Sequence, residues 1–318
     1  MHIAVIGCGR WGSFIAWYLH DLGHSVTLYG RNSSSKMQAF EQTRTNGLVT
    51  LSQEIKLSTE MGEAVDSADV VVISIASQGL RSLLETKKEQ LQGKSLILCM
   101  KGLEINTGKR LTEVVGETLG EQTPVAVWLG PGHVQEFVNR VPNCMVIDSA
   151  DEAFKRELVN AFSGDLIRFY YGQDLLGNEV GAAAKNVVGI AAGLLDGLGL
   201  GTLKGALMSR GTREMSRLIK AMGGNELSVY GLCHLGDYEA TVFSPYSHNR
   251  KFGECFAMGT PYQELAEGYY TVEALLKLSE TYQVELPISQ AIHDVLYEHT
   301  NLNETLDRLF RRTLKDEM

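Results

Sequence analysis

The chain has 318 residues, of which 44% are hydrophobic and 21% charged, a composition typical of a soluble globular protein with room for two domains. The net charge of −9 argues against a general nucleic-acid-binding protein, which needs a basic surface. No apolar run approaches the length of a membrane span, and the first residues lack the basic and cleavage regions of a secretory signal.

The cysteines and histidines bear on two further classes of protein. The five cysteines are odd in number and scattered, without a C-x-x-C pair, so we expect reduced thiols in a cytoplasmic protein. His133, His234 and His248 lie far apart, without the spacing typical of metal ligands, so we expect no metal site.

Residues 1–171 alternate short apolar runs with helical stretches. Several runs consist only of Val, Ile and Leu, as in a parallel sheet that is covered on both faces. The strands we expect are 2–6, 25–29, 70–75, 96–100, 125–129 and 144–148. The alternation predicts an α/β fold, a Rossmann-type doubly wound sheet forming a dinucleotide-binding domain over 1–171. Residues 48–52 and 54–57 further predict a small β-hairpin insert.

From about residue 175 the pattern changes to long helical periodicities. These cover 178–197, 203–222, 262–283 and 288–312. Gly223 and Gly224 are typical of a helix end, and Pro287 is typical of the first turn of a new helix. We therefore expect a mainly α-helical second domain over 172–318.

The first strand runs into a G-x-G-x-x-G sequence formed by Gly7, Gly9 and Gly12. A helical stretch and a second strand follow, which is the context of a dinucleotide-binding βαβ unit. Gly7 would permit the tight turn, Gly9 the approach of a pyrophosphate, and Gly12 close packing of helix and strand. The alternative is a glycine-rich turn without a ligand.

The end of the second strand carries cations where an NAD-specific site usually has an acid. The sequence there is Tyr-Gly-Arg-Asn-Ser-Ser-Ser-Lys over residues 29–36. Arg31 can meet the 2′-phosphate of NADPH, so we expect NADPH to be accepted and preferred, with NADH also used. Alternatively, Arg31 is a solvated loop cation.

Two further strands end in residues suited to a ligand. One runs into Lys101, and another runs into the glycine pair Gly130 and Gly132. Because ligands of open α/β sheets lie outside the carboxyl ends of the strands, these residues are expected at the cleft. An ordinary lysine at a strand end is the competing interpretation.

In the helical half, Lys185 stands in an almost side-chain-free run, Gly-Ala-Ala-Ala-Lys-Asn-Val-Val-Gly, over residues 181–189. Its neighbours on one helix face are small, so another backbone or a small ligand can approach closely. Desolvation there would lower the pKa of the amine, as a general acid or base requires. Alternatively, the lysine packs its stem on this surface and keeps its ammonium in water.

A donor-rich cluster follows at 231–237 and 244–250. Its hydroxyl, amide, imidazole and guanidinium groups suit a phosphate or a carboxylate. The alternative is a polar loop in which Ser247 or Asn249 caps the next helix.

With these motifs in order, the whole chain resembles the bacterial-type NAD(P)-dependent glycerol-3-phosphate dehydrogenases. The motifs that carry the resemblance are GCGRWG (7–12), KGLE (101–104), GPGHVQE (130–136), the block at 177–201, SRGTREMSRL (209–218), GLCHLGDYEAT (231–241), SPYSHNRKFGE (244–254) and AEGYYT (266–271). The resemblance implies reduction of dihydroxyacetone phosphate to sn-glycerol 3-phosphate for phospholipid synthesis. It also implies a cytoplasmic enzyme, often a homodimer, that acts on a small phosphorylated molecule.

The resemblance assigns roles residue by residue. Lys185 matches the proton donor and acceptor, and Lys101 matches the lysine that contacts both substrate and cofactor. The expected substrate-binding residues are Lys101, Gly130, Gly132, Lys185, Asp237, Ser247, His248, Asn249 and Arg250. The expected cofactor-binding residues are Gly7, Gly9, Arg10, Trp11, Gly12, Arg31, Lys101, Val134, His248, Leu265 and Glu267.

The chain departs from the family pattern at three positions. The family usually has Ser or Thr at Gly132, Ala at Val134, and an arginine at His248 that helps to hold the phosphate and the cofactor. Either Arg250 or a charged His248 substitutes for that arginine, or substrate binding is altered. The alternatives to the expected function are a reductase of another small phosphorylated ketone or 2-oxo acid, and a non-catalytic dinucleotide sensor.

Overall fold

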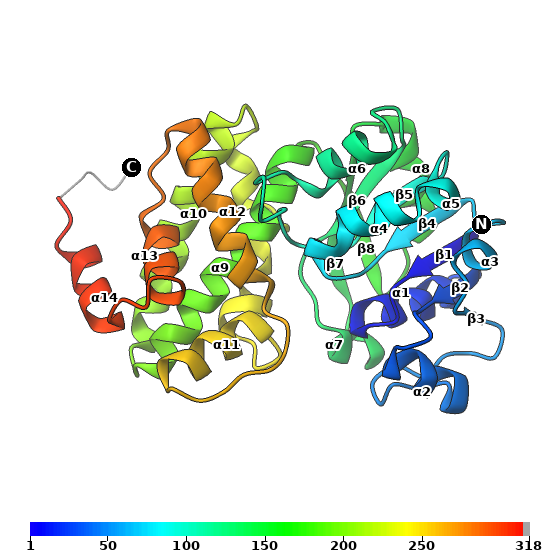
Figure 1. The fold of residues 1–318 in the computed structure, drawn as a ribbon, viewed down its shortest axis with the longest axis horizontal. Coiled ribbons are helices and arrows are strands. Elements are labelled where there is room, and N and C mark those ends of the chain that lie inside the picture. The colour runs from blue at the N-terminus through cyan, green and yellow to red at the C-terminus, as the bar shows by residue number, and fades with distance from the viewer. Residues whose placement is uncertain (314–318) are drawn as a thin grey trace. The chain divides into compact units, whose positions relative to one another are not determined.

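The computed structural model describes residues 1–313 of the chain, which divides into two units (Figure 1). The first unit consists of residues 1–101 and 109–179. The second consists of residues 102–108 and the chain from residue 180 onward.

The first unit is built on an eight-stranded sheet in the order β3-β2-β1-β4-β5-β6-β7-β8. The strands are β1 (His2–Ile6), β2 (Ser25–Tyr29), β3 (Lys56–Ser58), β4 (Val70–Ile73), β5 (Ser95–Leu98), β6 (Val125–Leu129), β7 (Asn143–Ser149) and β8 (Ile167–Tyr171). All neighbouring strands are parallel except β6 and β7. The strand order reverses between β1 and β4, which confirms the predicted doubly wound sheet.

Helices follow the strands in the first unit, and their apolar faces meet the sheet. They are α1 (Arg10–Asp21), α2 (Ser35–Thr43), α3 (Met61–Val65), α4 (Leu80–Thr86), α5 (Lys88–Leu91), α6 (Leu111–Leu119), α7 (Val134–Val138) and α8 (Glu152–Phe162). Aromatic residues fill part of this core: Trp128 of β6 packs edge-on against Phe169 of β8, with ring centroids 4.8 Å apart. The Tyr18 hydroxyl of α1 donates to the Phe162 carbonyl at 2.6 Å, which ties α1 to the end of α8.

The expected hairpin over 48–52 and 54–57 is wrong. Residues 56–58 form β3, which pairs in parallel with β2, and the only antiparallel pairing in the segment is an isolated bridge between Thr45 and Thr50. Asn46 explains the tight turn at that bridge, because its side-chain oxygen accepts hydrogen bonds from the backbone N–H groups of Leu48 and Val49. The alternation of apolar residues therefore predicted a strand correctly but not its partner.

The second unit is helical, as predicted (Figure 1). Its helices are α9 (Leu175–Gly197, whose first five residues belong to the first unit), α10 (Lys204–Ala221), α11 (His248–Ala257), α12 (Glu267–Tyr282), α13 (Pro287–Leu296) and α14 (Leu302–Phe310). None of the helices in residues 1–313 combines the length and the apolar character that crossing a membrane requires.

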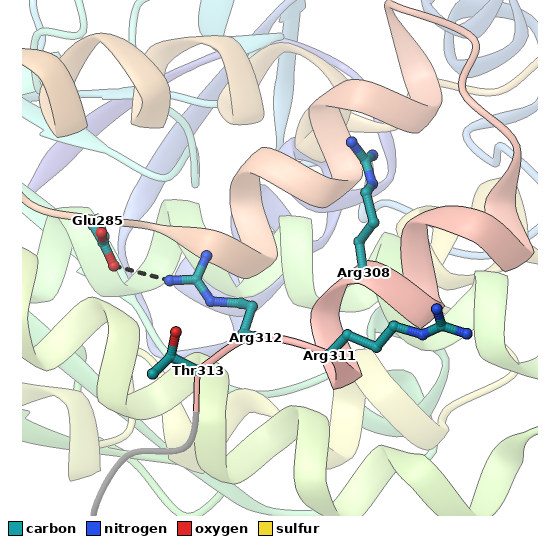
Figure 2. Close-up of a pocket in the computed structure, with 5 residues that line it drawn as sticks. All are labelled: Glu285, Arg308, Arg311, Arg312 and Thr313. Atoms are coloured by element: carbon teal, nitrogen blue, oxygen red, sulfur yellow. Dashed lines mark hydrogen bonds and ion pairs between the residues drawn. The ribbon is translucent and has the colours of Figure 1, made fainter.

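The stretch 288–312, expected as one helix, is two. His299 between them has a φ of 54°, which no helix continues through, and Asn301 caps α14 by accepting from the N–H groups of Asn303 and Glu304. Arginines cluster at the end of α14, where Arg312 pairs with Glu285 at 2.9 Å (Figure 2).

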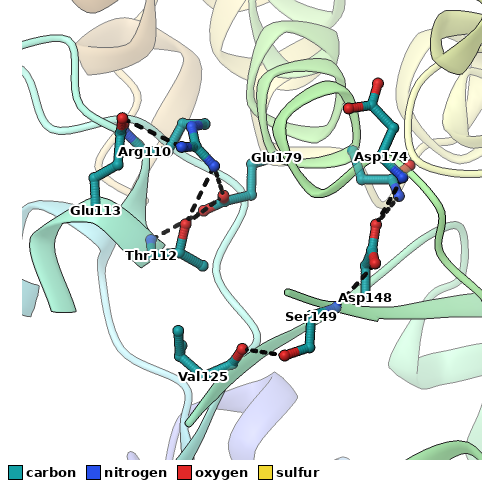
Figure 3. Close-up of polar contacts among 9 residues, drawn as sticks. Arg110, Thr112, Glu113, Val125, Asp148, Ser149, Asp174 and Glu179 are labelled. Carbon is teal, nitrogen blue, oxygen red and sulfur yellow. Dashed lines mark hydrogen bonds and ion pairs between the residues drawn. The ribbon is translucent and has the colours of Figure 1, made fainter. Parts of the chain in front are cut away.

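Two buried glutamates cap helices from a distance. Glu179 accepts from the backbone N–H of Thr112 at 3.0 Å and from its hydroxyl at 2.6 Å, and it pairs with Arg110 at 2.9 Å (Figure 3). Glu214 of α10 accepts from the N–H groups of Ile288 and Ser289 in the first turn of α13. Burial raises the pKa of both carboxyl groups. Each accepts from donors that a helix start leaves unsatisfied, and at α6 the Glu113 side chain also accepts from the Arg110 N–H at 2.8 Å.

Glycines, which have no side chain, let the backbones of α9 and α11 pack directly against each other. A Cβ atom on Gly193 of α9 would overlap the Arg250 carbonyl oxygen, and one on Gly253 of α11 would overlap the Ile190 carbonyl oxygen. The small residues of α9 therefore serve close helix packing, which was one of the two uses that their pattern suggested.

We predict that Gly253→Ala lowers the free energy of unfolding by about 1–3 kcal/mol or more, because the new methyl group must push two helix backbones apart. Gly205→Ala, in the exposed first turn of α10 where a Cβ meets nothing within 4 Å, should instead stabilise by about 0.5 kcal/mol. Urea unfolding of both variants measures this. A Gly253→Ala protein as stable as the parent would contradict the backbone contact.

Candidate functional site

The turn after β1 fits a dinucleotide. Gly7 has a φ of +112°, and a Cβ atom there would overlap the Ser74 carbonyl oxygen. A Cβ on Gly12 would overlap the Gly7 carbonyl oxygen, whereas one on Gly9 would meet nothing within 4 Å. Gly7 and Gly12 thus shape the turn itself, and Gly9 leaves an open space in front of α1 that a pyrophosphate can approach.

The N-terminus of α1 faces this open space with its donors uncapped. Gly9 is the N-cap residue, and no side chain caps its helix. The free N–H groups and the helix dipole favour an anion here. Trp11, in the first turn, is half-buried, and its ring lies 5.2 Å from that of Phe14 and 6.1 Å from that of Phe137. Trp11 therefore supports α1 through an aromatic cluster.

The loop after β2 presents exposed cations. Arg31 and Lys36 are exposed, and residues 29–36 contain no carboxylate. Ser34 caps α2, since its hydroxyl oxygen accepts from the Met37 N–H at 3.4 Å. Arg31 and Lys36 are thus the charged donors of this loop that suit a 2′-phosphate.

Lys101 and Gly130 meet at the ends of β5 and β6. The Lys101 ammonium donates to the Gly130 carbonyl at 2.6 Å. Gly130 and Gly132 have φ values of +124° and +138°, which side chains rarely adopt. A Cβ on Gly132 would also overlap the ring of Phe137, which stacks on Phe14 at 4.9 Å. Where the family usually has the side chain of Ser or Thr, this chain therefore has Gly132, and the ring of Phe137 occupies the space.

In the second unit, Lys185 lies in a buried polar cluster. Its side chain is 9% exposed, and its Nζ lies 3.1 Å from Oδ2 of Asp237, which is 1% exposed. Nζ also donates to the Thr241 hydroxyl at 2.8 Å, and that hydroxyl donates to the Asp237 carbonyl at 2.7 Å. A carboxylate so close favours the ammonium form of the lysine, and Asp237 and Thr241 together fix the direction of its amine.

His234 holds the segment that carries Asp237 against α9. Its Nδ1 lies 2.8 Å from the Gly181 carbonyl oxygen, and its Nε2 lies 2.8 Å from the Tyr238 hydroxyl. A carbonyl only accepts, so Nδ1 carries the proton and Nε2 accepts from the tyrosine. Burial lowers the pKa of this imidazole from 6.5 to about 4. His234 is therefore neutral, and its two hydrogen bonds hold the segment 234–238 against α9.

The segment 247–250 starts α11 and is tied into the unit on several sides. Ser247 is the N-cap, its hydroxyl accepting from the Arg250 N–H at 3.3 Å, as the alternative interpretation expected. The His248 Nδ1 lies 2.5 Å from the Tyr262 hydroxyl, and the Arg250 Nε pairs with Asp196 at 2.7 Å.

Asn249 joins three helices. Its amide nitrogen donates to the Asn186 side-chain oxygen at 3.0 Å, and its own side-chain oxygen accepts from the Gly268 N–H at 2.9 Å. Asn186 follows Lys185 on α9, and Gly268 lies in the first turn of α12, directly after Glu267. Leu265, just before this turn, is exposed. Asn249 thus fixes the turn of α9 that carries the lysine.

Comparison with known proteins identifies the family. The model of the NAD-dependent glycerol-3-phosphate dehydrogenase N-terminus matches residues 2–155, and that of the C-terminus matches residues 174–307. The chain belongs to the NAD-dependent glycerol-3-phosphate dehydrogenase family.

Relatives of this family match along their whole length. The glycerol-3-phosphate dehydrogenase [NAD(P)+] of Fusobacterium nucleatum is 34% identical over 99% of this chain and 98% of its own. The protein of the same name from a Thermoanaerobacter species is 34% identical over 100% and 99%. The crystal structure of glycerol-3-phosphate dehydrogenase from Coxiella burnetii superposes with a TM-score of 0.92 at 26% identity, covering 98% of this chain and 99% of that one.

Two residues that hold the Lys185 cluster in place, Thr241 within it and His234 beside it, were not predicted in that role from the sequence. Thr241 lies four residues after Asp237, a spacing that a helical turn brings to one side, and this spacing was the available signal. His234 carried no such signal, because it contacts α9 through a backbone carbonyl of the distant Gly181.

We predict that the free energy of unfolding depends on the charge of His234. Its pKa is about 4 when folded and about 6.5 when unfolded, so the unfolded chain binds the extra proton first as the pH falls. Stability should therefore decrease by up to about 3 kcal/mol between pH 6.5 and pH 4.

Urea unfolding at several pH values, compared between the parent and His234→Asn, isolates this contribution. The variant should show a flatter pH dependence over this range. His299→Asn, at an exposed histidine, is the matched control and should follow the parent curve. Parallel curves for the parent and His234→Asn would contradict the buried neutral imidazole.

Proposed function

We propose that this chain reduces dihydroxyacetone phosphate to sn-glycerol 3-phosphate with NADPH, or with NADH, and that Lys185 is its general acid and base. The observation that carries the proposal is the buried cluster of Lys185, Asp237 and Thr241. Membership of the glycerol-3-phosphate dehydrogenase family supports the reaction, and the open glycine turn at Gly9 supports the cofactor.

The cofactor-binding residues we propose come mainly from the first unit. Gly7, Gly9, Arg10, Trp11 and Gly12 form the turn and first helical residues that would hold the pyrophosphate. Arg31 would hold the 2′-phosphate, and Lys101, Val134, His248, Leu265 and Glu267 complete the proposed contacts. When bound, a reduced nicotinamide supplies hydride to the carbonyl carbon of the substrate.

Lys185 supplies the proton that balances the hydride. Its ammonium donates to the oxygen of the substrate carbonyl as negative charge develops there, and it takes the proton back in the reverse reaction. Asp237 favours the ammonium form of the lysine, and Thr241 accepts a hydrogen bond from it. Because all three are buried, little reorganisation is needed when the proton moves.

Lys101 is the second lysine to which the family resemblance assigns a role in catalysis. Its ammonium is only half-buried and already donates to the Gly130 carbonyl, which fixes its direction. A cation held in place in this way stabilises developing negative charge more than a mobile one. We propose that Lys101 polarises the carbonyl and that Gly130 and Gly132 line the substrate.

The substrate phosphate requires fixed donors, which we assign to Ser247, His248, Asn249 and Arg250. Arg250 is the principal one, because its pairing with Asp196 uses Nε and its two Nη groups make no hydrogen bond or ion pair with any residue in 1–313. A planar guanidinium with two free groups matches a phosphate well. His248, whose Nδ1 lies beside the Tyr262 hydroxyl, would contribute less.

Further parts of the proposal rest on the family resemblance. We propose that residues 1–171 are the dinucleotide-binding domain and 172–318, of which 314–318 lie outside the described residues, the mainly substrate-binding and catalytic domain, and that the enzyme works in the cytoplasm as a homodimer. Its product would supply phospholipid synthesis. Sedimentation velocity tests the oligomeric state, and a monomer at micromolar concentration would remove the dimer from the proposal.

Lys185→Ala should lower kcat about 10²–10⁴-fold, because it removes the proton donor, while NADPH binding stays unchanged. Lys185→Arg should also lower kcat strongly, although it keeps the charge beside Asp237, because a guanidinium holds its proton too tightly. Steady-state kinetics with a separate NADPH titration measures both effects.

Lys220→Ala, at an exposed lysine of α10 paired with Glu226, is the matched control and should retain full kcat. A folded Lys185→Ala protein with near-normal kcat would end the assignment of Lys185.

Arg31→Asp should weaken the binding of NADPH much more than the binding of NADH, because it places a carboxylate where the 2′-phosphate would bind. The dissociation constants of both cofactors measure the effect. Arg156→Asp, at an exposed arginine of α8, should change neither. Equal loss for NADPH and NADH in Arg31→Asp would show that Arg31 does not contact the 2′-phosphate.

Arg250→Ala should raise the KM for dihydroxyacetone phosphate at least about tenfold, because it removes a charge-assisted contact, and His248→Ala should raise it less. KM measured from pH 6 to pH 9 separates the two residues. A larger effect of His248→Ala that grows at low pH would assign the phosphate to a charged imidazole instead.

A further inference from the structure

An apolar cavity lies in the second unit, apart from every residue proposed above for catalysis or binding. Its volume is about 740 Å³, within the range of roughly 300–1,000 Å³ typical of ligand pockets. Leucines and isoleucines from α9, α13 and α14 line it, including Leu194, Ile292, Leu306 and Leu309. The cavity is therefore a hydrophobic site of ligand size.

Arginines line part of this cavity and an adjoining hollow. Arg210, Arg213 and Arg217 of α10 line the cavity directly. Arg308 and Arg311 line an adjoining hollow of about 520 Å³ that shares Glu285, Arg312 and Thr313 with the cavity (Figure 2). The two hollows together are lined by six arginines but by only two glutamates, in a chain with a net charge of −9.

The acids nearby leave part of this positive charge uncompensated. Glu285 pairs with Arg312 at 2.9 Å, and Arg308 pairs with Asp294 at 3.0 Å. Glu214, the other glutamate of the lining, is buried and caps the first turn of α13.

The guanidinium groups of Arg213 and Arg311 make no hydrogen bond or ion pair with any residue in 1–313. Both arginines line the hollows, so their charge is available to a ligand. An apolar cavity lined by one unpaired cation, next to a hollow lined by another, is complementary to one kind of molecule, an apolar chain that ends in an anionic group.

We propose that this cavity binds one molecule of a single-chain amphiphile with a phosphate or carboxylate head group. Its alkyl chain lies among the leucines of α9, α13 and α14, and its head group meets Arg213 and Arg311. The site is separate from the proposed dehydrogenase reaction, so either can fail without the other.

The test is calorimetric titration of the full-length protein with octyl, decyl and dodecyl phosphate, and with laurate, below their critical micelle concentrations. We expect one molecule per chain and an affinity that rises up to about fourfold for each added methylene, as burial of a CH₂ group predicts. Laurate and dodecyl phosphate distinguish the two head groups. Dodecyl maltoside, which is uncharged, should bind at least about tenfold more weakly.

Variants locate the site. Ala206→Trp, at an exposed residue of α10 that lines the cavity, should abolish binding by filling it, and Arg311→Glu should weaken dodecyl phosphate about tenfold. Arg156→Glu, in α8 of the first unit, is the matched control and should change nothing.

Several outcomes would overturn the proposal. Affinity that does not depend on chain length, or binding that survives Ala206→Trp, would exclude this cavity. Binding only to anionic vesicles would indicate a membrane surface instead. If the parent protein is a dimer and Ala206→Trp dissociates it, a second copy of the chain covers the cavity instead.

Discussion

The ion pair between Lys185 and Asp237 is the contact on which the account of this protein depends. Both side chains are almost entirely buried, and their charged atoms lie 3.1 Å apart. Removing either partner would leave a buried charge without compensation, at a cost of about 3–5 kcal/mol. The surrounding structure must therefore keep the two together: Thr241 bonds to both residues, and His234 ties the Asp237 segment to the Gly181 carbonyl.

The close packing of α9 makes this burial possible. Because Gly181 has no side chain, His234 can pack closely against it: a Cβ atom added at Gly181 would lie only 3.0 Å from the His234 Cβ. Gly193 in the same way allows the backbone of α11 to pack against α9. Larger residues at these positions would move the neighbouring segments away and let water reach the lysine. The small residues of α9 and Lys185 thus act together: the close packing excludes water, and the Asp237 carboxylate favours the charged form of the lysine.

Sequence patterns predicted the elements of this structure better than its contacts. The Val-rich runs gave most strands, because strands buried on both faces have few polar positions. They missed β8, where Arg168 and two exposed tyrosines interrupt the apolar pattern, and they gave β3 the wrong partner. Spacing could bring Gly7, Gly9 and Gly12 together, since they share one turn. It could not pair Lys185 with Asp237, which lie 52 positions apart, and only the family resemblance linked them.

The most direct test of the account is the pH dependence of kcat for NADPH-dependent reduction of dihydroxyacetone phosphate, compared between the parent and Asp237→Asn. If Asp237 holds Lys185 as the ammonium that donates the proton, kcat should fall at high pH, and the fall should move to lower pH in the variant. An unchanged pH profile in a folded, NADPH-binding Asp237→Asn protein, or no turnover of dihydroxyacetone phosphate by the parent, would contradict it.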